Sequence, residues 1–223
     1  VTGVDRAFGM ILQALKDAGL DDNTIVVFSS DHGETMCSQN TDDPKNSPYT
    51  ESMNVPFIIR YGSKLKPHVD NLLLSSPDIM PTMLGMAGLS DKIPADLHGK
   101  DYSRLFYSPE DATVKRPDAA LYIQNMDGNK DAEGNVIDYF PSSRGLKTHK
   151  YTLAVYIDRQ YNKERVLLFD DQNDPYQLQN IADTKEGKAT IKQLYKRMGE
   201  LLTEIDDPWI GKGIYKKVAK QLK

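Results

Sequence analysis

Residues 24–34 read Thr-Ile-Val-Val-Phe-Ser-Ser-Asp-His-Gly-Glu, an apolar run that turns abruptly polar. The run from Thr24 to Phe28 is short, β-branched and almost wholly apolar, so it predicts a strand buried on both faces of a parallel sheet. In open α/β sheets, ligands bind just beyond the carboxyl ends of the strands. The polar residues after the run are therefore placed where a metal or a reacting group would be held.

Three side chains near this turn have suitable chemistry. Asp31 offers an anionic oxygen and His32 a neutral nitrogen, and together they suit a divalent cation with open positions. Gly33 lets the chain turn sharply beside them. Lys45 is a compact cation suited to an anionic group held by the same metal. A solvated Asp-His-Gly turn with one exposed lysine would account for the same residues, and the residues alone leave both interpretations open.

The order of the motifs around this turn carries a family resemblance. Residues 30–34 read SDHGE, residues 45–52 read KNSPYTES and residues 55–59 read VPFII. In order and spacing they resemble the second half of a sulfatase of the alkaline-phosphatase superfamily. The resemblance implies that Asp31 and His32 are metal ligands and that Lys45 contacts the sulfate or its bridging oxygen.

Two further substrate-binding residues follow from the resemblance. The family often has Gly-Ser-His-Gly where residues 37–40 read CSQN, so Gln39 could serve the substrate only as a neutral hydrogen-bonding group. His149, at the opening of a predicted strand, could reach the mouth of the active site, as C-terminal residues do in some sulfatases.

The resemblance also implies two cofactors. One is a divalent cation, with calcium first and magnesium or manganese as alternatives, because a histidine ligand admits transition ions. The other is formylglycine, which sulfatases make from the Cys or Ser of a Cys/Ser-x-Pro/Ala-x-Arg motif. Cys37 is the single cysteine and lacks the Pro and Arg of that motif. We therefore expect the N-terminal half of the same enzyme to supply the nucleophile, and this chain alone to be inactive.

Composition bounds the class of protein. The chain has 223 residues, 39% of them hydrophobic and 27% charged, which is ordinary for a globular protein. Its net charge of −4 argues against a nucleic-acid surface, and no apolar run approaches the roughly 18 residues of a membrane span. The chain begins at Val1 without an initiator Met, which suggests a piece of something longer. The resemblance suggests a periplasmic or secreted protein.

We expect an α/β fold: the C-terminal part of an alkaline-phosphatase-like mixed sheet with flanking helices, then a small antiparallel-sheet-plus-helix (α+β) subdomain. The predicted boundaries are residues 1–107, a linker at 108–117 and residues 118–223. The first part is predicted to contain an amphipathic helix at 2–18 with a buried apolar face, strands at 55–61 and 72–75, and a helix at 78–89 capped by Asp78.

The second part is predicted to contain strands at 119–124, 142–147, 151–157 and 165–169 and a long helix opened by a capping box of Asp183 and Glu186. Residues 168–182, LFDDQNDPYQLQNIA, resemble the sulfatase segment Leu-Tyr-Asp-Leu-x-x-Asp-Pro-x-Glu-x-x-Asn-Leu-Ala, which is structural.

The resemblance implies that the parent enzyme hydrolyses sulfate esters of a glycan or an aryl alcohol. Two alternatives remain open. A phosphodiesterase or phosphoglycerol-transferase relative shares the Asp-His-Gly strand, but such enzymes usually supply more ligands for two metals, and this chain has four histidines. A fragment without its nucleophile could instead be a non-catalytic binding module. The sulfated substrate, exo or endo action and the oligomeric state are not predicted.

Overall fold

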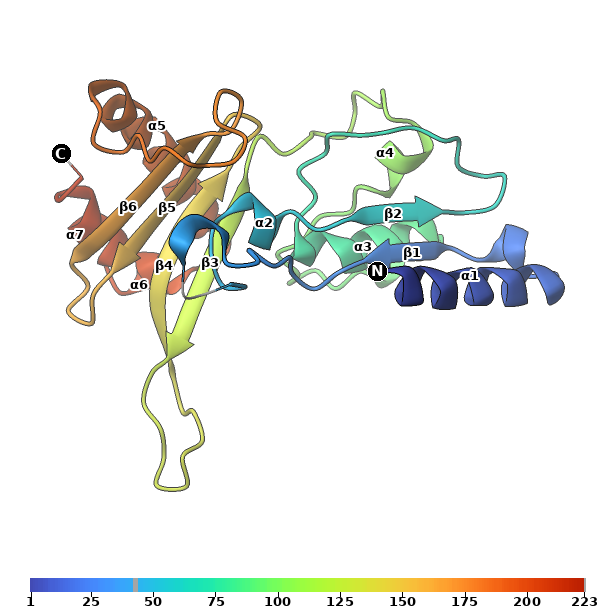
Figure 1. Cartoon of the computed structure of the whole chain (residues 1–223), viewed down its shortest axis with the longest axis horizontal. Helices are drawn as coiled ribbons and strands as arrows, with labels where there is room; N and C mark the ends of the chain where they lie inside the picture. The colour runs from blue at the N-terminus through green and yellow to red at the C-terminus, as the bar shows by residue number, and fades with distance from the viewer. Residues whose placement is uncertain (42–43, 223) are drawn as a thin grey trace. The chain divides into compact units, whose positions relative to one another are not determined.

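A computed structural model describes residues 1–41 and 44–222, in which the chain forms two compact units. The first unit contains Val1–Asp31, Val55–Asn71 and Pro77–Lys115, and the second contains His32–Asn54, Leu72–Ser76 and Arg116–Lys223. The mixture of helices and antiparallel strands fits the predicted α/β class (Figure 1). Within the described ranges, no helix is both long enough and apolar enough to cross a membrane.

The first unit is built on a two-stranded ribbon. Strands β1 (Val26–Ser29) and β2 (Phe57–Arg60) pair antiparallel, with Val26 opposite Arg60. The helices of this part of the chain are α1 (Thr2–Asp17), the short 3-10 helices η1 (Asp21–Asn23) and η3 (Ser90–Lys92), α3 (Ser76–Met86) and α4 (Ser103–Tyr107).

Two expectations for this unit are wrong. The strand predicted at 24–28 was expected inside a parallel sheet, yet β1 pairs antiparallel with β2, and Val27 and Ile58 are 36% and 63% exposed. Helix α1 has no buried residue, although its apolar face was expected in a core. An apolar pattern predicts that a face is buried, but it does not predict which segment packs against that face.

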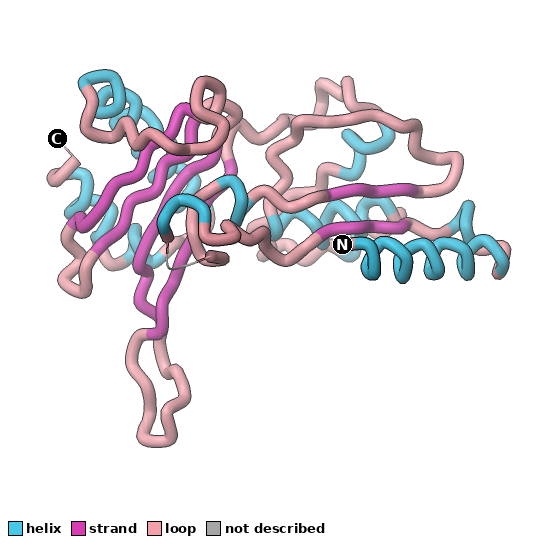
Figure 2. Tube along the Cα trace, in the orientation of Figure 1, coloured by secondary structure: helices cyan, strands magenta, loops and turns pink. Residues whose placement is uncertain are grey.

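Two more local predictions fail around α3. Residues 72–75 form loop, not a strand (Figure 2). Asp78 lies inside α3, so it is not the helix cap; its carboxylate accepts a hydrogen bond from the backbone N–H of Lys100, at 2.9 Å. Thr82, one turn later, accepts from the N–H of Tyr102 at 3.1 Å. The two side chains thus fix the segment that leads into α4.

The second unit is a four-stranded antiparallel meander, and its four predicted strands are confirmed. The order is β3 (Ala120–Asp127), β4 (Tyr139–Lys147), β5 (Tyr151–Ile157) and β6 (Lys163–Asp170). After the sheet come α5 (Lys185–Glu204), α6 (Pro208–Gly211) and α7 (Ile214–Ala219). The 3-10 helix η2 (Ser38–Asn40) and helix α2 (Thr50–Met53) come earlier in the chain but belong to this unit.

Helix α5 begins one residue later than the predicted capping box requires. Its N-cap is Thr184, whose hydroxyl accepts from the N–H of Gly187 at 2.9 Å. A Cβ atom at position 187 would lie 1.8 Å from the carbonyl oxygen of Ile181. Because the chain before the helix passes so close, the residue whose N–H donates to the cap must be a glycine, and it is Gly187 and not Glu186.

The sheet is covered on both faces by parts of its own unit. Alternation along the strands sends one set of side chains to each face. One face packs against α5, and its core consists of Leu146, Leu153, Val155 and Leu168 with Ile191, Tyr195, Met198 and Leu202. The other face carries Tyr122, Ala154, Leu167 and Phe169, against which Tyr49 packs. In Figure 1 the C-terminal helices lie behind the sheet and α2 lies in front of it.

A buried ion pair fastens the C-terminal helices to the sheet. Nε of Arg144 on β4 lies 2.9 Å from Oδ2 of Asp207, and the two side chains are 1% and 4% exposed. Asp207 also caps α6 by accepting from the N–H of Trp209 at 2.8 Å. Burial lowers the pKa of Arg144, although the carboxylate opposes that shift. Asp207 is therefore the counter-charge that offsets the desolvation of the buried guanidinium.

Asp207→Ala is expected to destabilise the protein by about 3–5 kcal/mol, because it leaves the buried guanidinium without its counter-charge and removes a helix cap. Urea unfolding measures the change. Asp118→Ala is the matched control, because Asp118 is 63% exposed in its ion pair with Arg197 and should contribute at most about 1 kcal/mol. Equal losses in the two variants would contradict the assignment.

Candidate functional site

The candidate site begins where β1 ends. Ser29 is the last residue of the strand, and the exposed Asp31 follows two residues later. The hydroxyl of Ser30 donates to Oδ1 of Asp31 at 3.3 Å. Asp31 is exposed, and a carboxylate, with about four lone-pair sites, is a suitable ligand type for a cation.

His32 is held as one tautomer. Its Nδ1 lies 2.8 Å from the carbonyl oxygen of Gly33. A carbonyl oxygen can only accept, so Nδ1 donates this hydrogen bond, and Nε2 is the ring nitrogen with metal-binding chemistry in that tautomer. Histidines that bind metals typically have the other ring nitrogen fixed in this way. Asp31 and His32 thus present an oxygen and a nitrogen donor on consecutive residues.

Gly33 is required for a close approach between backbones. The N–H groups of Gly33 and Glu34 donate to the carbonyl oxygens of Ser52 and Glu51, at 2.7 and 2.9 Å. A Cβ atom at position 33 would lie 1.9 Å from the oxygen of Glu51. The close approach, and not a left-handed backbone, is therefore what requires a glycine at this position.

Helix α2 also fixes the backbone of Lys45. Ser52, which is 1% exposed, donates its hydroxyl hydrogen bond to the carbonyl oxygen of Lys45. The side chain of Lys45 is exposed. One short helix therefore holds both the turn after His32 and the backbone of the candidate cationic residue.

The segment from His32 to Asn54 is anchored on the four-stranded sheet. The carbonyl oxygen of Asn46 accepts from the hydroxyl of Tyr122 at 3.1 Å and from Nε2 of Gln124 at 3.0 Å. The ring of Tyr49 lies 5.7 Å from the ring of Phe169. Residues on β3 and β6 thereby position a segment that precedes them by more than seventy positions.

Gln39 is partly occupied by the protein itself. Its Nε2 donates to the carbonyl oxygen of Tyr176 at 2.6 Å and to Oε1 of Glu51 at 3.3 Å. Its φ is 62°, and Met36, Cys37 and Asn40 also have left-handed backbones. For residues other than glycine such conformations are strained, and strain of this kind gathers at functional sites. The role of Gln39 toward a substrate stays a prediction.

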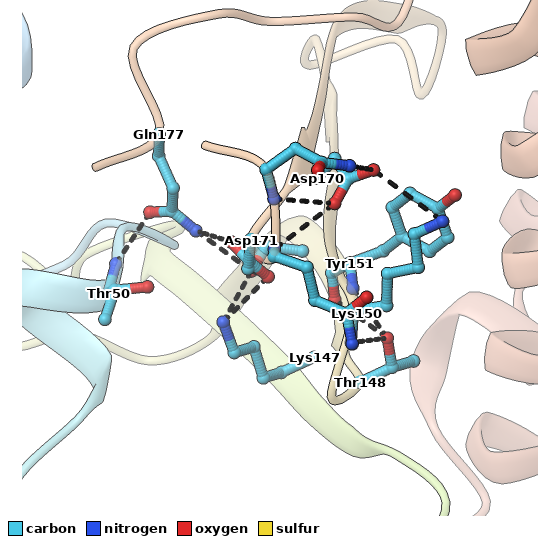
Figure 3. Close-up of polar contacts among 11 residues, drawn as sticks. Thr50, Lys147, Thr148, Lys150, Tyr151, Asp170, Asp171 and Gln177 are labelled. Carbon is cyan, nitrogen blue, oxygen red and sulfur yellow. Dashed lines mark hydrogen bonds and ion pairs between the residues drawn. The ribbon is translucent and has the colours of Figure 1, made fainter. Parts of the chain in front are cut away.

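His149 lies in the turn between β4 and β5 and is exposed. Thr148 closes the turn by accepting from the N–H groups of Lys150 and Tyr151, at 3.2 and 2.8 Å (Figure 3). A side-chain hydrogen bond with Tyr151 raises the pKa of Lys150, and the charge of Asp170 adds to that effect. The turn is cationic and ordered, whereas the contact of His149 with a substrate stays a prediction.

The donor set suits a metal but is small. Among the residues that the structure describes, no three His, Cys, Asp or Glu side chains group closely enough to hold an ion. Asp31 and His32 supply two donors, and calcium takes about six to eight oxygen ligands. Asp31 belongs to the first unit and His32 to the second, and their role as ligands stays a prediction.

Comparison with known proteins identifies the family. The sulfatase family model matches residues 1–89. The chain is 62% identical over 210 residues to an endo-4-O-sulfatase of Bacteroides thetaiotaomicron. The aligned region covers 94% of this chain and 41% of that protein. The chain belongs to the sulfatase family. The predicted resemblance is thereby confirmed.

Other sulfatases match over a similar span. An ulvan-active sulfatase of Formosa agariphila is 31% identical, over 97% of this chain and 40% of that protein. A solved structure from work on the metabolism of multiple glycosaminoglycans by Bacteroides thetaiotaomicron superposes with a TM-score of 0.92 at 60% identity, over 96% of this chain and 44% of that one. The chain thus spans about two fifths of the length of these sulfatases.

The sequence motifs did not reveal what positions this sulfatase segment. Ser52 belongs to a family motif, but no sequence pattern pairs it with the carbonyl of Lys45. Gln177 lies in the segment that the resemblance describes as structural, and the structure shows that it is 1% exposed and bonds to Thr50 of α2. One signal was available: Asp171 and Gln177 stand where the resembled pattern has Leu and Glu.

Gly33→Ala is expected to destabilise the protein by about 1–3 kcal/mol, because the added methyl group collides with the backbone of Glu51 and forces the two chains apart. Thermal or urea unfolding measures the loss. Gly9→Ala is the matched control, since a Cβ atom at that position in α1 meets nothing within 4 Å and alanine favours helix. A neutral Gly33→Ala variant would refute the close approach.

Proposed function

We propose that this chain is part of a sulfatase that hydrolyses sulfate esters of glycans, and that the ester it cleaves is a 4-O-sulfate within a sugar chain. The observation that carries the proposal is the 62% identity, over 94% of the chain, to an endo-4-O-sulfatase. The donor chemistry of Asp31 and His32 and the exposed cation at Lys45 support it. The 62% match to a sulfatase also favours sulfate over the phosphoryl-transfer alternative.

Asp31 and His32 would hold a divalent cation, with calcium as the first choice. The accessible carboxylate of Asp31 and the unprotonated Nε2 of His32 provide two of its ligands, and the remainder of the longer enzyme provides the others. Such a cation neutralises charge on sulfate oxygens when bound. The protein's own part is to orient the donors, and the bond from Nδ1 of His32 to its neighbouring carbonyl serves that purpose.

Lys45 would stabilise negative charge on the sulfate or on the leaving oxygen. Its carbonyl is fixed by Ser52, and the next carbonyl, that of Asn46, is fixed by Tyr122 and Gln124. A cation on an immobilised backbone can meet developing charge without reorganisation. The nucleophile is formylglycine from the N-terminal half of the same enzyme, because Cys37 lacks the required sequence context. We also propose a periplasmic or secreted location, on the family resemblance alone.

In the full-length enzyme, Lys45→Ala is expected to lower kcat about 100- to 1,000-fold on a 4-O-sulfated glycan oligosaccharide, because one preorganised charge at the transition state is lost. Sulfate release measures the rate. Lys188→Ala, at an exposed position on α5, is the control and should be neutral. The 223-residue chain alone should show no turnover above the Lys45→Ala level. Unchanged kcat in Lys45→Ala, or faster hydrolysis of a phosphodiester than of the sulfate, would defeat the proposal.

Asp31→Ala is expected to weaken calcium binding by the full-length protein about 10- to 100-fold, because one anionic ligand is removed from the ion. Titration calorimetry after removal of the metal with a chelator measures the affinity without reference to turnover. Asp91→Ala, at a side chain that is 68% exposed, is the matched control and should bind calcium normally. Equal affinities for the two variants would remove Asp31 from the ligand set.

A further inference from the structure

We propose that Gln177 is a positioning residue of the sulfatase site: from the turn after β6, its side chain fixes α2 and, through α2, the backbone at Lys45 and at the His32–Gly33 turn. This inference rests on the function proposed above. It adds a residue that touches neither metal nor substrate, and that acts through the segment carrying the residues that do.

The burial of Gln177 is unusual for its surroundings. Its side chain is 1% exposed, whereas the neighbouring Tyr176 and Leu178 are 72% and 73% exposed. Its φ of 54° is in the left-handed region, which is strained for a residue other than glycine or asparagine. A polar side chain turned inward at a strained position requires compensating contacts.

Both the NH2 group and the oxygen of the Gln177 side-chain amide make hydrogen bonds. Nε2 donates to Oγ1 of Thr152 at 3.0 Å and to Oδ1 of Asp171 at 2.6 Å. Oε1 accepts from the backbone N–H of Thr50 at 2.8 Å. Figure 3 shows Gln177 between Thr50 and Asp171. Rotating the amide by half a turn would set its NH2 against an N–H group and its oxygen against a carboxylate, so the contacts permit one orientation.

Asp171 is itself held in place. Its Oδ2 accepts from Nζ of Lys147 and from Oγ1 of Thr152, both at 2.8 Å. Lys147 also donates to Oγ1 of Thr152 at 3.1 Å. The network therefore contains one carboxylate, one ammonium group, one hydroxyl and one neutral amide, and its charges balance. This rigid base on β4, β5 and the end of β6 orients Gln177.

The amide transmits that position to the site through α2. Thr50 is the first residue of α2, and the N-cap residue Tyr49 offers no side-chain cap, so Gln177 satisfies a donor that the helix leaves open. One and two residues further along the same helix, the carbonyl groups of Glu51 and Ser52 accept from the backbone after His32, and the hydroxyl of Ser52 donates to the carbonyl of Lys45. A displacement of α2 would thus move the candidate catalytic lysine and the candidate metal ligand together.

The test compares Gln177→Leu with Asn180→Ala in the full-length enzyme. The leucine keeps the volume but makes no hydrogen bond, so kcat is expected to fall about 10- to 100-fold while KM changes less than about threefold. Asn180 lies in the same segment but bonds to Leu168, Ala182 and Val166 instead of α2. Its variant should lose stability and keep kcat within about twofold.

Hydrogen exchange of the same proteins gives a readout independent of turnover. Gln177→Leu is expected to raise exchange in peptides covering residues 45–54, whereas Asn180→Ala should raise it only in peptides covering 166–182. Equal exchange at 45–54 in Gln177→Leu and the unmodified protein would overturn the proposal. Should Gln177→Leu not fold, Gln177→Asn is used: it keeps an amide that tolerates the left-handed backbone but is one methylene too short to reach Thr50.

A double variant that swaps the amide of Gln177 and the carboxylate of Asp171 provides a rescue test of kcat. Gln177→Glu places a second carboxylate beside that of Asp171, and Asp171→Asn leaves Lys147 without its counter-charge, so each alone should lower kcat at least tenfold. The double variant again holds one carboxylate and one amide and should recover kcat to within about fivefold. Additive losses would overturn the proposal.

The outcomes separate this inference from the function on which it rests. Loss of kcat in Lys45→Ala with normal kcat in Gln177→Leu would refute the role of Gln177 alone. Unchanged kcat in Lys45→Ala would refute the proposed catalytic role of the lysine, and with it the positioning role assigned to Gln177.

Discussion

Two backbone hydrogen bonds, from Gly33 and Glu34 to Ser52 and Glu51, are the constraint on which the candidate site depends. They join the end of the Asp-His-Gly turn to a four-residue helix that could not persist alone, because helices of that length do not repay their nucleation cost. The helix is therefore stable only when its ends and side chains are held from outside. Tertiary contacts, and not local propensity, determine where the turn and Lys45 lie.

Those contacts come from the face of the antiparallel sheet that α5 leaves uncovered. A strand alternates its side chains, so β5 sends Leu153 and Val155 to the helical core and Ala154 to the opposite face. On that opposite face, Tyr122 and Phe169 contact the segment that contains α2. The four-stranded sheet thus has two packing roles. One face packs against α5, and the other supports the candidate catalytic segment.

The sequence predicted what depends on local pattern. The four strands of the sheet follow from β-branched and aromatic runs bounded by turns. Motif order nominates Asp31, His32 and Lys45, whose roles stay predictions. The tie between Thr50 and Gln177 joins residues 127 positions apart, and no periodicity encodes such a pairing. The prediction of a parallel strand at 24–28 is wrong for a related reason. An apolar run predicts burial but not the packing partner. In the described chain, β2 pairs with one edge of β1 and Val27 is exposed.

The charge balance around Gln177 explains why this residue type stands there. The resembled family pattern has Leu and Glu at positions 171 and 177, and this chain has Asp and Gln, so it keeps one acid but moves it by six positions. With Asp171 already paired to Lys147, a second carboxylate 2.6 Å away would have no counter-charge in the network, whereas an amide offers a donor to the acid and an acceptor to Thr50. A network of buried polar groups is stabilising only when every member is satisfied. The two departures from the pattern are therefore consistent with each other, and together they keep α2 attached to the sheet.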